Sequence, residues 1–567
     1  MARGSIVWLL IGAVLLCGGL GLAAAVQRQG GVSVDAVEFE GASGARMRAL
    51  LFRPATATSA NPAPAILAIH GYLNSAEMQS NYAIEFARRG YVVLAPDQRG
   101  HGSSDPAAFA DGFGGPDSLA YLRSLPFVDA GNVGLEGHSM GGWAVLAAAR
   151  SNPDGYRAMV LQGSSVGAPF APEGDSVFPR NLLVVFATHD EFGGFMWGPE
   201  SPARTGATAK AMALFGTDGP VEAGRLYGDI ESGTARLLQT PRMTHAWLHH
   251  SPTAIAAALD WFDRTLTGQR RLPTANQVWP RKELGAALAL AGIAPFVIGL
   301  FGMFAGRWLP ESQARMVAQP APPANALARR ATLIGLMLIP VASYVPVMRL
   351  AESLISENLV FRQTFSNQIA IWLACNALLA WAASLLPGMP RPPGSRVAPL
   401  WAAMVATLVA VTLHLVISLA DGIGHVSPQF WIAIWRPLTW ARLQDFVVYL
   451  PVLLFYFAVA FRAIHGVYPL NEAGAGRAFA ITAGIMAGPF VVFLAAQYAT
   501  LFATGTLLFP TEGLRVIISI LFVPLMALAS GIAVASCRRT GDTLPGALLT
   551  GILVTWFLVA TQPMGAG

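Results

Sequence analysis

The second half of the chain is a series of long apolar runs separated by short polar loops. A helix needs about 20 apolar residues to cross a bilayer, and non-helical backbone is not tolerated against lipid because its polar groups would lack partners. Charge is scarce in the same region: residues 284–567 hold 23 charged side chains, whereas residues 1–283 hold 46. The pattern predicts an all-α polytopic transmembrane bundle of about eight helices over 284–567. Their expected ranges are 284–304, 330–350, 366–386, 399–420, 444–463, 478–503, 514–536 and 545–562.

A further apolar run covers residues 5–26, directly after Met-Ala-Arg. Its uncharged length of about 22 residues is enough to span a bilayer, and it exceeds the 7–15 apolar residues of a signal-peptide core. A cleaved signal peptide is the alternative, since the alanines at 23–25 could serve a peptidase. We expect residues 1–27 to be an uncleaved transmembrane anchor that delivers the following residues across the membrane.

The arginines between the apolar runs indicate which side of the membrane each loop occupies. With the N-terminus inside, the inner loops hold eleven arginines and the outer loops and span ends hold five. Basic residues concentrate in cytoplasmic loops. The basic pairs at 270–271 and 281–282 would lie outside and so oppose this orientation. They flank a long translocated domain, however, and such domains largely escape the rule. The inner set is Arg3, Arg307, Arg315, Arg329, Arg330, Arg391, Arg396, Arg462, Arg477, Arg538 and Arg539, and the outer set is Arg349, Arg362, Arg436, Arg442 and Arg515. We therefore predict an integral protein of a bacterial-type inner or plasma membrane, with the first half extracytoplasmic (periplasmic).

Residues 28–268 follow a different pattern, in which short apolar runs alternate with helical signals. Strands are expected at 65–69, 91–95, 132–136, 158–162 and 182–187, and helices at 80–89, 141–151 and 253–266. Strands interleaved with helices are typical of a doubly wound, mostly parallel sheet, and about 240 residues suffice for one such domain. We predict one α/β domain over 28–268, joined by a linker, 269–283, to the membrane domain, 284–567.

Composition excludes several other classes of protein. The net charge of +5 is spread over short loops without a Lys/Arg block, so no nucleic-acid partner is expected. Only three cysteines occur, Cys17, Cys375 and Cys537, each within or beside an apolar run. We expect neither a disulfide framework nor a thiol nucleophile in the α/β domain.

The pentapeptide Gly-His-Ser-Met-Gly at 137–141 matches the nucleophile-elbow pattern G-x-S-x-G. An elbow needs a strand before the serine and a helix after it, and Ser139 has NVGLE before it and GGWAVLAAARS after it. The sequence GSSVG at 163–167 matches too, but Ala-Pro-Phe-Ala-Pro follows it and cannot begin such a helix. We predict that Ser139, rather than Ser165, is the nucleophile.

A serine hydroxyl needs a base to accept its proton, and the base needs an acid to fix its tautomer. After an elbow of this kind the acid comes next in the chain and the histidine last. Asp190 follows the strand run 182–187, and His245 directly precedes the last helix of the domain. We predict a Ser139-His245-Asp190 triad. The rival positions are Glu191 for the acid and His249 or His250 for the base.

Two backbone N–H groups are needed to stabilise the oxyanion of the tetrahedral intermediate. We assign them to Met140, after the nucleophile, and to Tyr72, in the loop after the strand run 65–69. His70 and His101 are expected to be structural. No histidines show the spacing of metal ligands, so neither a metal nor a cofactor is expected.

These motifs together resemble the α/β-hydrolase superfamily, nearest to its dienelactone-hydrolase-like and serine-esterase/peptidase branches. The resemblance rests on AILAIHGYLNSAEMQSNYAIEFARRGYVVLAPDQRGHGSSD, NVGLEGHSMGG, THDEF and THAW, and covers about residues 35–268. It implies a serine hydrolase that forms an acyl-enzyme, but it implies no particular substrate. The multi-span half matches no transporter or channel motif.

Three other segments have more than one interpretation. Residues 192–232 should supply a helix near 204–215, and the remainder is a candidate lid facing the membrane. The polar residues of 414–425 share one helix face, which fits either a functional site in the bundle or solvation at its outer end. The aromatic segment 428–440 suits an interfacial helix or belt.

The sequence thus predicts a membrane-tethered, extracytoplasmic serine hydrolase that cleaves carboxylic esters, plausibly of lipid or envelope material. Its expected partners are a small-molecule or lipid ester and the lipid bilayer. The alternatives are a serine peptidase, a membrane acyltransferase with the same triad, and a transporter or sensor whose hydrolase-like domain only binds.

Overall fold

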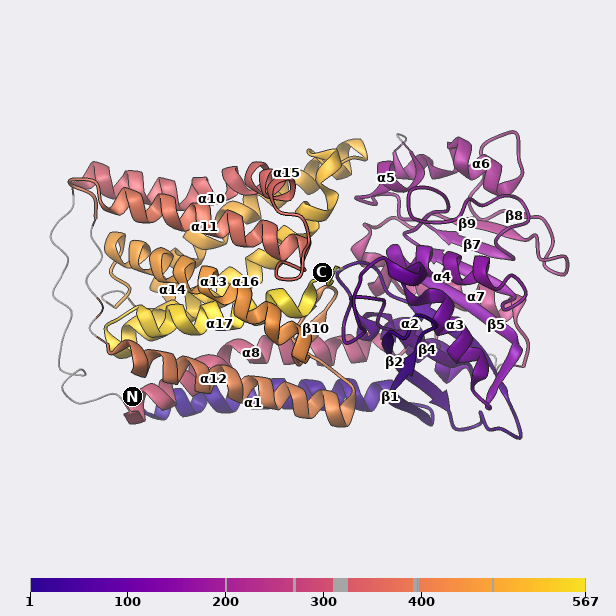
Figure 1. The fold of residues 1–567 in the computed structure, drawn as a ribbon, viewed down its shortest axis with the longest axis horizontal. Coiled ribbons are helices and arrows are strands. Elements are labelled where there is room, and N and C mark those ends of the chain that lie inside the picture. Colours follow the sequence, from indigo (N-terminus) through magenta and orange to yellow (C-terminus); the bar gives the residue numbers. More distant parts are fainter. Residues whose placement is uncertain are drawn as a thin grey trace.

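A computed structural model describes residues 2–198, 201–268, 272–308, 325–390, 395, 397–471 and 474–565. An α/β region and a region of long helices lie end to end along the longest axis of the molecule (Figure 1). The N-terminus lies at the end of the helical region farthest from the α/β region, and the C-terminus lies at the boundary between the two.

The α/β region contains a nine-stranded sheet with the strand order β1-β2-β4-β3-β5-β6-β7-β9-β8. The six strands from β4 to β9 in this order pair in parallel, whereas β1, β2 and β8 add antiparallel pairs at the two edges. The strands are β1 Val32–Glu40, β2 Arg46–Pro54, β3 Ala63–Ile69, β4 Val92–Pro96, β5 Val128–His138, β6 Ala158–Gln162, β7 Leu182–Val185, β8 Leu226–Tyr227 and β9 Arg236–Gln239. This is the α/β-hydrolase fold with a mostly parallel sheet.

Helices cover both faces of this sheet. One face packs on α2 (Ser80–Arg88) and α7 (Pro252–Thr265), and the other on α3 (Gly115–Ser124) and α4 (Met140–Ser151). The central strands β3, β4, β6 and β7 are buried along their whole length, which explains why they are continuous apolar runs in the sequence. The segment after β7 holds two short helices, α5 (Gly193–Trp197) and α6 (Ala209–Phe215), and α6 lies within the helix expected at 204–215.

The helical region consists of α1 together with the helices that follow the α/β region. Eight of the described helices are long and apolar enough to cross a membrane, and a ninth span is counted if the pair α14–α15 is one. Their bounds are α1 Ala2–Gln27, α8 Trp279–Trp308, α10 Ala326–Leu354, α11 Thr364–Ser384, α12 Pro399–Gly424, α13 Trp440–Val467, α14 Ala475–Met486, α15 Gly488–Thr504, α16 Gly513–Thr540 and α17 Leu544–Thr561.

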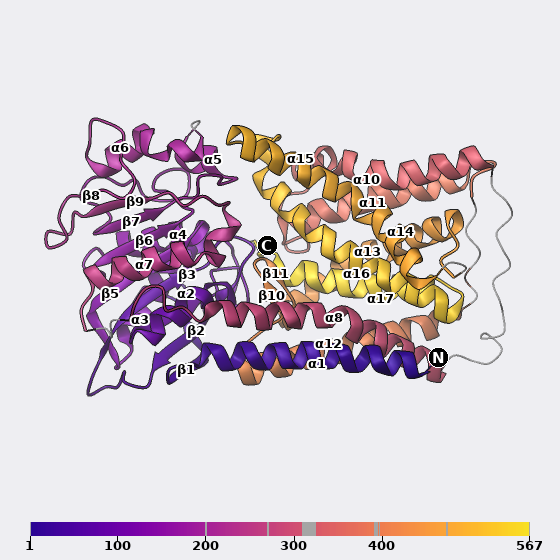
Figure 2. The same ribbon diagram turned by 180° about the vertical axis from the view of Figure 1, so that it is seen from behind.

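The expected span 478–503 is therefore a broken helix. Its halves, α14 and α15, are bent by 52° at Ala487. Pro489 lies in the first turn of α15, where its missing N–H and its ring prevent continuous helical bonding through the break. The bend directs α15 towards the α/β region (Figure 2).

The N-terminal helix α1 packs along α8 through glycines on both helices. A Cβ added to Gly12 would lie 2.2 Å from the backbone nitrogen of Phe296, and one added to Gly292 would lie 2.5 Å from that of Leu16. Small residues that let two helices approach this closely are typical of packing inside membranes. This close fit is what the predicted uncleaved anchor requires.

The segment 428–440 is not an interfacial helix. Residues 429–434 form a short antiparallel hairpin, β10 (Gln429–Phe430) and β11 (Ala433–Ile434), and α13 begins only at Trp440. Phe430 stacks on His250 of the α/β region with ring centroids 4.8 Å apart. Pro428 and Pro437 flank the hairpin and interrupt helical hydrogen bonding. Phe430 thus serves the contact between the two regions, whereas Trp435 packs on Trp556 and Phe557 of α17.

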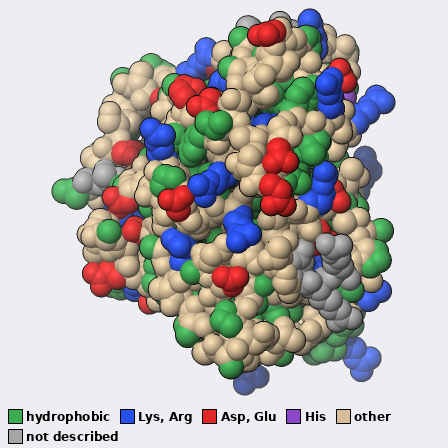
Figure 3. Space-filling model, turned by 90° about the vertical axis from the view of Figure 1, so that its right-hand side faces the viewer, with side chains coloured by type: hydrophobic (Ala, Val, Ile, Leu, Met, Phe, Trp, Pro, Cys, Tyr) green, Lys and Arg blue, Asp and Glu red, His purple; other side chains and the backbone are tan. Residues whose placement is uncertain are grey.

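The far end of the α/β region shows Lys, Arg, Asp and Glu side chains interspersed over its whole surface, as expected of a face in water (Figure 3). The opposite end carries the loops that follow the carboxyl ends of the parallel strands. These loops contact the ends of the long helices, so the sheet edge where hydrolases of this fold place their chemistry faces the helical region.

Candidate active site

Ser139 occupies the turn between β5 and α4, with φ 53° and ψ −122°. A positive φ is unfavourable for a residue with a Cβ and is maintained only where the surroundings impose it. The flanking glycines impose it here: a Cβ on Gly137 would lie 2.3 Å from the carbonyl oxygen of Gly141, and one on Gly141 would lie 2.0 Å from that of Ile69. The half-buried Ser139 side chain is thus held at the tip of a strained strand-to-helix turn.

Asp190 and His245 meet at the same edge of the sheet. Asp190 lies in the loop after β7 and His245 in the loop after β9, and Asp190 Oδ2 lies 2.8 Å from His245 Nδ1. Both side chains are buried. The other carboxylate oxygen of Asp190 accepts the backbone N–H of Phe192 at 2.9 Å, so the carboxylate is fixed in direction and orients the imidazole ring.

Gln162, the last residue of β6, and the following Gly163 lie beside Ser139 and His245, respectively. The Ser139 N–H donates to the carbonyl oxygen of Gln162 at 2.8 Å. A Cβ on Gly163 would lie 3.0 Å from Cε1 of the His245 ring. The serine and the imidazole therefore flank the same dipeptide, and Asp190 pairs with that imidazole. That the three side chains act as one triad stays a prediction.

The two predicted oxyanion donors adjoin Ser139. Met140 is the first residue of α4, and first-turn N–H groups have no acceptor within their own helix. Tyr72 follows Gly71, whose added Cβ would lie 3.0 Å from Cβ of Ser139. His70 holds this loop: its Nδ1 lies 2.7 Å from the Gly71 carbonyl oxygen, and its Nε2 accepts the Gln98 N–H at 3.0 Å. Burial lowers the pKa of His70, which suits the structural role expected for it.

The electrostatics favour a basic imidazole at position 245. Burial alone lowers the pKa of His245, but the charge and hydrogen bond of Asp190, together with Glu191, outweigh it and raise the pKa above its ordinary value. A neutral His245 is therefore a strong proton acceptor. Burial and the neighbouring Asp190 raise the pKa of Glu191 to about 7.

The rival positions are occupied differently. Glu191 does not bond the imidazole of His245; its Oε2 accepts the backbone N–H of that residue at 2.8 Å. Ser165 is buried and lies 3.6 Å from the sulfur of Met196. His249 packs on His138 with ring centroids 3.9 Å apart, and His250 faces Glu283 at 3.6 Å. Across the described ranges, no group of three or more His, Cys, Asp or Glu side chains is arranged to hold a metal ion.

The helical region supports both loops of the site, which the sequence did not reveal. The Tyr498 hydroxyl of α15 donates to Glu191 Oε1 at 2.8 Å, and thus holds the residue next to the predicted acid. On the other side, the ring of Phe365 in α11 lies 6.3 Å from that of Tyr72. These residues are far apart in the sequence, and a single Tyr or Phe in an apolar run carries no signal of such a contact.

Five charged side chains, four of them buried, join the two regions beside the site. Arg48 lies 3.1 Å from Glu77 and 3.4 Å from Asp97, and reaches Asp421 of α12 at 3.6 Å. Arg436 of the helical region lies 3.5 Å from Asp97 and 3.8 Å from Glu77. Burial raises the pKa of Asp97, but the two arginines outweigh it and hold the pKa well below its ordinary value. Asp421, one of the polar residues on the face at 414–425, is thus an ion-pair partner at the interface.

Comparisons with known proteins agree with the fold of the α/β region. Residues 64–216 match the family described as the alpha/beta hydrolase fold. A monoacylglycerol lipase of Mycolicibacterium smegmatis is 32% identical over 138 residues, which are 23% of this chain and 46% of the lipase. The chain therefore spans about half the length of the curated relative that it matches.

Among solved structures, an esterase of Pyrococcus furiosus aligns over 42% of this chain and 94% of its own, with 15% identity and a TM-score of 0.31. A thioesterase domain from the curacin biosynthetic pathway aligns over 41% and 99%, with 16% identity and a TM-score of 0.27. The chain contains a region, residues 64–216, that matches the α/β-hydrolase fold. The nearer resemblance to the dienelactone-hydrolase branch stays a prediction.

Proposed function

We propose that this protein is a membrane-embedded serine hydrolase that cleaves carboxylic esters of lipid or envelope material. Ser139 is the nucleophile, His245 the base, Asp190 the acid that orients it, and the backbone N–H groups of Met140 and Tyr72 form the oxyanion hole. The observation that carries the proposal is the 2.8 Å Asp190–His245 pair next to a serine in a strained elbow.

The arrangement accounts for both halves of the reaction. His245 Nε2 takes the proton of the Ser139 hydroxyl as its oxygen attacks the ester carbonyl, and the two N–H groups bind the oxyanion. When the intermediate collapses, the imidazolium gives that proton to the departing alcohol and an acyl-enzyme remains. Water, deprotonated by the same base, then attacks the acyl carbon and releases the carboxylic acid, which restores Ser139.

An apolar acyl group fits the surroundings of Ser139. Trp143, one turn into α4, stacks on Phe170 with ring centroids 4.9 Å apart, and Phe195 of α5 lies 6.5 Å from Phe170. Phe170 and Phe195 are 43% and 54% exposed, and large exposed aromatic groups beside a reactive centre are typical of sites for apolar substrates. The lipase relative acts, by its name, on a glycerol ester with one acyl chain, and a lipid substrate also suits a site that faces the long helices.

The contacts of the five outer arginines support the extracytoplasmic orientation. Each is bound by the protein itself: Arg349 and Arg515 by Glu512, Arg362 by Asp445, Arg436 by Asp97 and Glu77, and Arg442 by backbone carbonyl groups. Their positions are therefore explained by these partners. The excess of arginine on the inner side then agrees with the rule that basic residues concentrate in cytoplasmic loops.

A fluorophosphonate probe tests the proposal, because it reacts with an activated serine whatever the natural ester is. We expect the purified, detergent-solubilised chain to be labelled, Ser139→Ala to lose labelling, and Ser165→Ala to keep it. Turnover of ester, peptide and lipid panels then defines the bond that is cleaved. Absence of labelling in the unaltered chain contradicts the proposal, and turnover of peptides alone favours the peptidase.

A further inference from the structure

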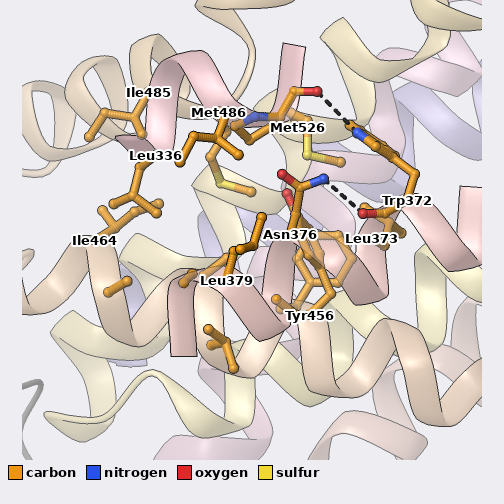
Figure 4. A pocket seen from close by; sticks show the side chains of 18 of the residues that line it. Leu336, Trp372, Leu373, Asn376, Leu379, Tyr456, Ile464, Ile485, Met486 and Met526 are labelled. Carbon is orange, nitrogen blue, oxygen red and sulfur yellow. Dashed lines mark hydrogen bonds between the residues drawn. The ribbon is translucent and has the colours of Figure 1, made fainter. Parts of the chain in front are cut away.

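The helical region contains a cavity of about 690 Å³. It lies between α10, α11, α13, α14, α15, α16 and α17, and its lining is dominated by Leu, Ile, Phe, Met and Ala side chains. Figure 4 shows Asn376 and Trp372 within this apolar lining, with their amide and indole nitrogens bonded to backbone carbonyl groups of Trp372 and Pro340. This volume falls within the roughly 300–1,000 Å³ of ordinary ligand sites.

An empty space of this size between apolar side chains is costly. Water does not stabilise it, because apolar cavities offer no hydrogen bonds, and a void forfeits the dispersion contacts of every side chain that lines it. An apolar occupant is therefore expected, and acyl chains are the apolar molecules that surround a helix bundle in a bilayer.

The shape of the cavity fits an acyl chain that enters from the bilayer. Along α11 its lining runs from Ile369 to Leu385, a rise of about 24 Å, compared with about 30 Å for the whole hydrocarbon core. Some lining side chains of α10 and α11 are also exposed on the outer surface, so this wall is shared with the surrounding lipid. They are Ile339, Leu379, Trp381 and Leu385.

The cavity ends in a polar group on the side of the α/β region. Gln562, directly after α17, lines the cavity and is 3% exposed, and its Oε1 has no hydrogen-bond partner among the described residues. Its backbone carbonyl accepts Arg442 Nη1 at 2.7 Å, which fixes this residue in place. The amide oxygen itself is enclosed by its surroundings, so Gln562 contributes a fixed, buried polar residue to this end of the lining.

The same end of the cavity adjoins the candidate active site. Ile369 lies one helical turn after Phe365, and the Phe365 ring packs on that of Tyr72, the predicted oxyanion residue. A lipid of the leaflet next to the α/β region would have its polar end on this side and its chain in the bilayer core. That is the direction from Gln562 into the cavity.

We propose that the cavity is the acyl-chain site for the lipid ester that the α/β region hydrolyses. One long chain enters between α10 and α11, its polar end lies near Gln562, and the ester group lies on the side of Tyr72 and Ser139. This assignment rests on the proposed function and adds that the substrate is a long-chain lipid taken from the bilayer.

Tryptophan substitutions on two walls of the cavity test the proposal. Ala380→Trp on α11 and Ala463→Trp on α13 fill it from different helices, and Ala382→Trp is the matched control because Ala382 is exposed and lies outside the lining. The full-length protein is assayed in nanodiscs with a 16-carbon monoacylglycerol and with a soluble acetate ester. Excluding about two methylene groups costs on the order of tenfold, so the ratio of long-chain to acetate turnover should fall by that factor in the two cavity variants and stay constant in the control. Fluorophosphonate labelling reports that each variant is folded.

A second measurement does not depend on catalysis. A 16-carbon monoacylglycerol with a diazirine in its chain is photolysed with Ser139→Ala protein, and the adducts are mapped by mass spectrometry. We expect adducts on the lining of α11, α13 and α16. These adducts should be lost when Ala380→Trp is combined with Ser139→Ala. The lipid site is overturned if the ratio of long-chain to acetate turnover is unchanged in both cavity variants and both still react with the fluorophosphonate. It is also overturned if the adducts are confined to the outer surface. In either case the proposed hydrolase stands. Wild-type turnover by Ser139→Ala overturns the proposed hydrolase instead, and the adduct map still decides whether the cavity binds lipid.

Discussion

Replacing Asp190 by asparagine removes the charge that orients the predicted base and changes almost nothing else. The carboxylate is buried, one oxygen lies 2.8 Å from His245 Nδ1, and the other accepts the N–H of Phe192. Asparagine has the same shape, so the loop should keep its fold. Its amide can donate to Nδ1, however, and that bond selects the tautomer in which Nε2 carries the proton and cannot accept one from Ser139.

The expected loss follows from that geometry. Where an aspartate of this kind is changed to asparagine, kcat falls by about 10⁴, which corresponds to about 5 kcal/mol of transition-state stabilisation. Glu191→Gln is the matched control, because Glu191 is the adjacent carboxyl group and bonds the backbone N–H of His245 and the Tyr498 hydroxyl but not the imidazole ring. Glutamine keeps an oxygen for that N–H and an amide for Tyr498, so we expect a loss of less than about tenfold.

The pH profile separates the two positions further. Catalysis needs neutral His245, so kcat/KM should rise with pH through its pKa, which lies above 6.5 because Asp190 and Glu191 outweigh burial. Removing the carboxyl group of Glu191 removes one of the causes that raise this pKa, so the acid limb should move to lower pH in Glu191→Gln. Steady-state hydrolysis of a chromogenic ester from pH 5 to 9 measures both the rates and the limb. A larger loss in Glu191→Gln than in Asp190→Asn refutes the assignment of the acid, and an acid limb that moves to higher pH refutes the electrostatic reasoning.

Three further predictions concern the nucleophile, the interface and the orientation. Ser139→Ala should lower hydrolysis by about 10⁴–10⁶, measured with the same ester, while Ser165→Ala keeps most of the activity; comparable losses in both would contradict the elbow. Arg436→Met should destabilise the contact between the two regions by about 3–5 kcal/mol, because buried Asp97 loses one of its two arginines. Limited proteolysis should become faster and the Tm in detergent should fall, whereas an unchanged Tm would contradict this role of Arg436. A cysteine at exposed Ser59 should react with an impermeant maleimide in intact cells above the background of the unaltered chain, and reaction only after membrane disruption would reverse the topology.

The strands that the sequence predicts are those buried on both faces. The runs at 158–162 and 182–187 correspond to β6 and β7, because a strand covered by helices on both sides must be apolar at every position. The edge strand β1 was not predicted, since it alternates buried and exposed residues and includes Asp35, Glu38 and Glu40. Its partner β2 was missed with it, although β2 is buried along most of its length. The alternation of apolar and polar residues in β1 is the local signal that could have indicated this strand.

The positions of the helices in the second half could also be predicted from the sequence, but the break in one helix and the structure of the loops could not. Length and hydropathy determine that a run can cross a bilayer, so each expected span has a counterpart in the structure. The bend at Ala487 and the hairpin at 429–434 depend on proline positions and on which surface lies opposite. Composition favoured an interfacial helix or belt at 428–440, where a hairpin instead brings Phe430 onto His250 of the α/β region.

Ser139, Asp190 and His245 could be named from the sequence because chain order and strand ends constrain them strongly. Parallel strands place all their carboxyl ends at one edge of a sheet, so residues that follow different strands must meet there. The direction in which that edge points, the contacts of Tyr498 and Phe365 with the two loops of the site, and the cavity between the helices were decided only by the tertiary structure. Each depends on how surfaces far apart in the chain fit together, and a linear pattern of apolar residues specifies burial without specifying the partner.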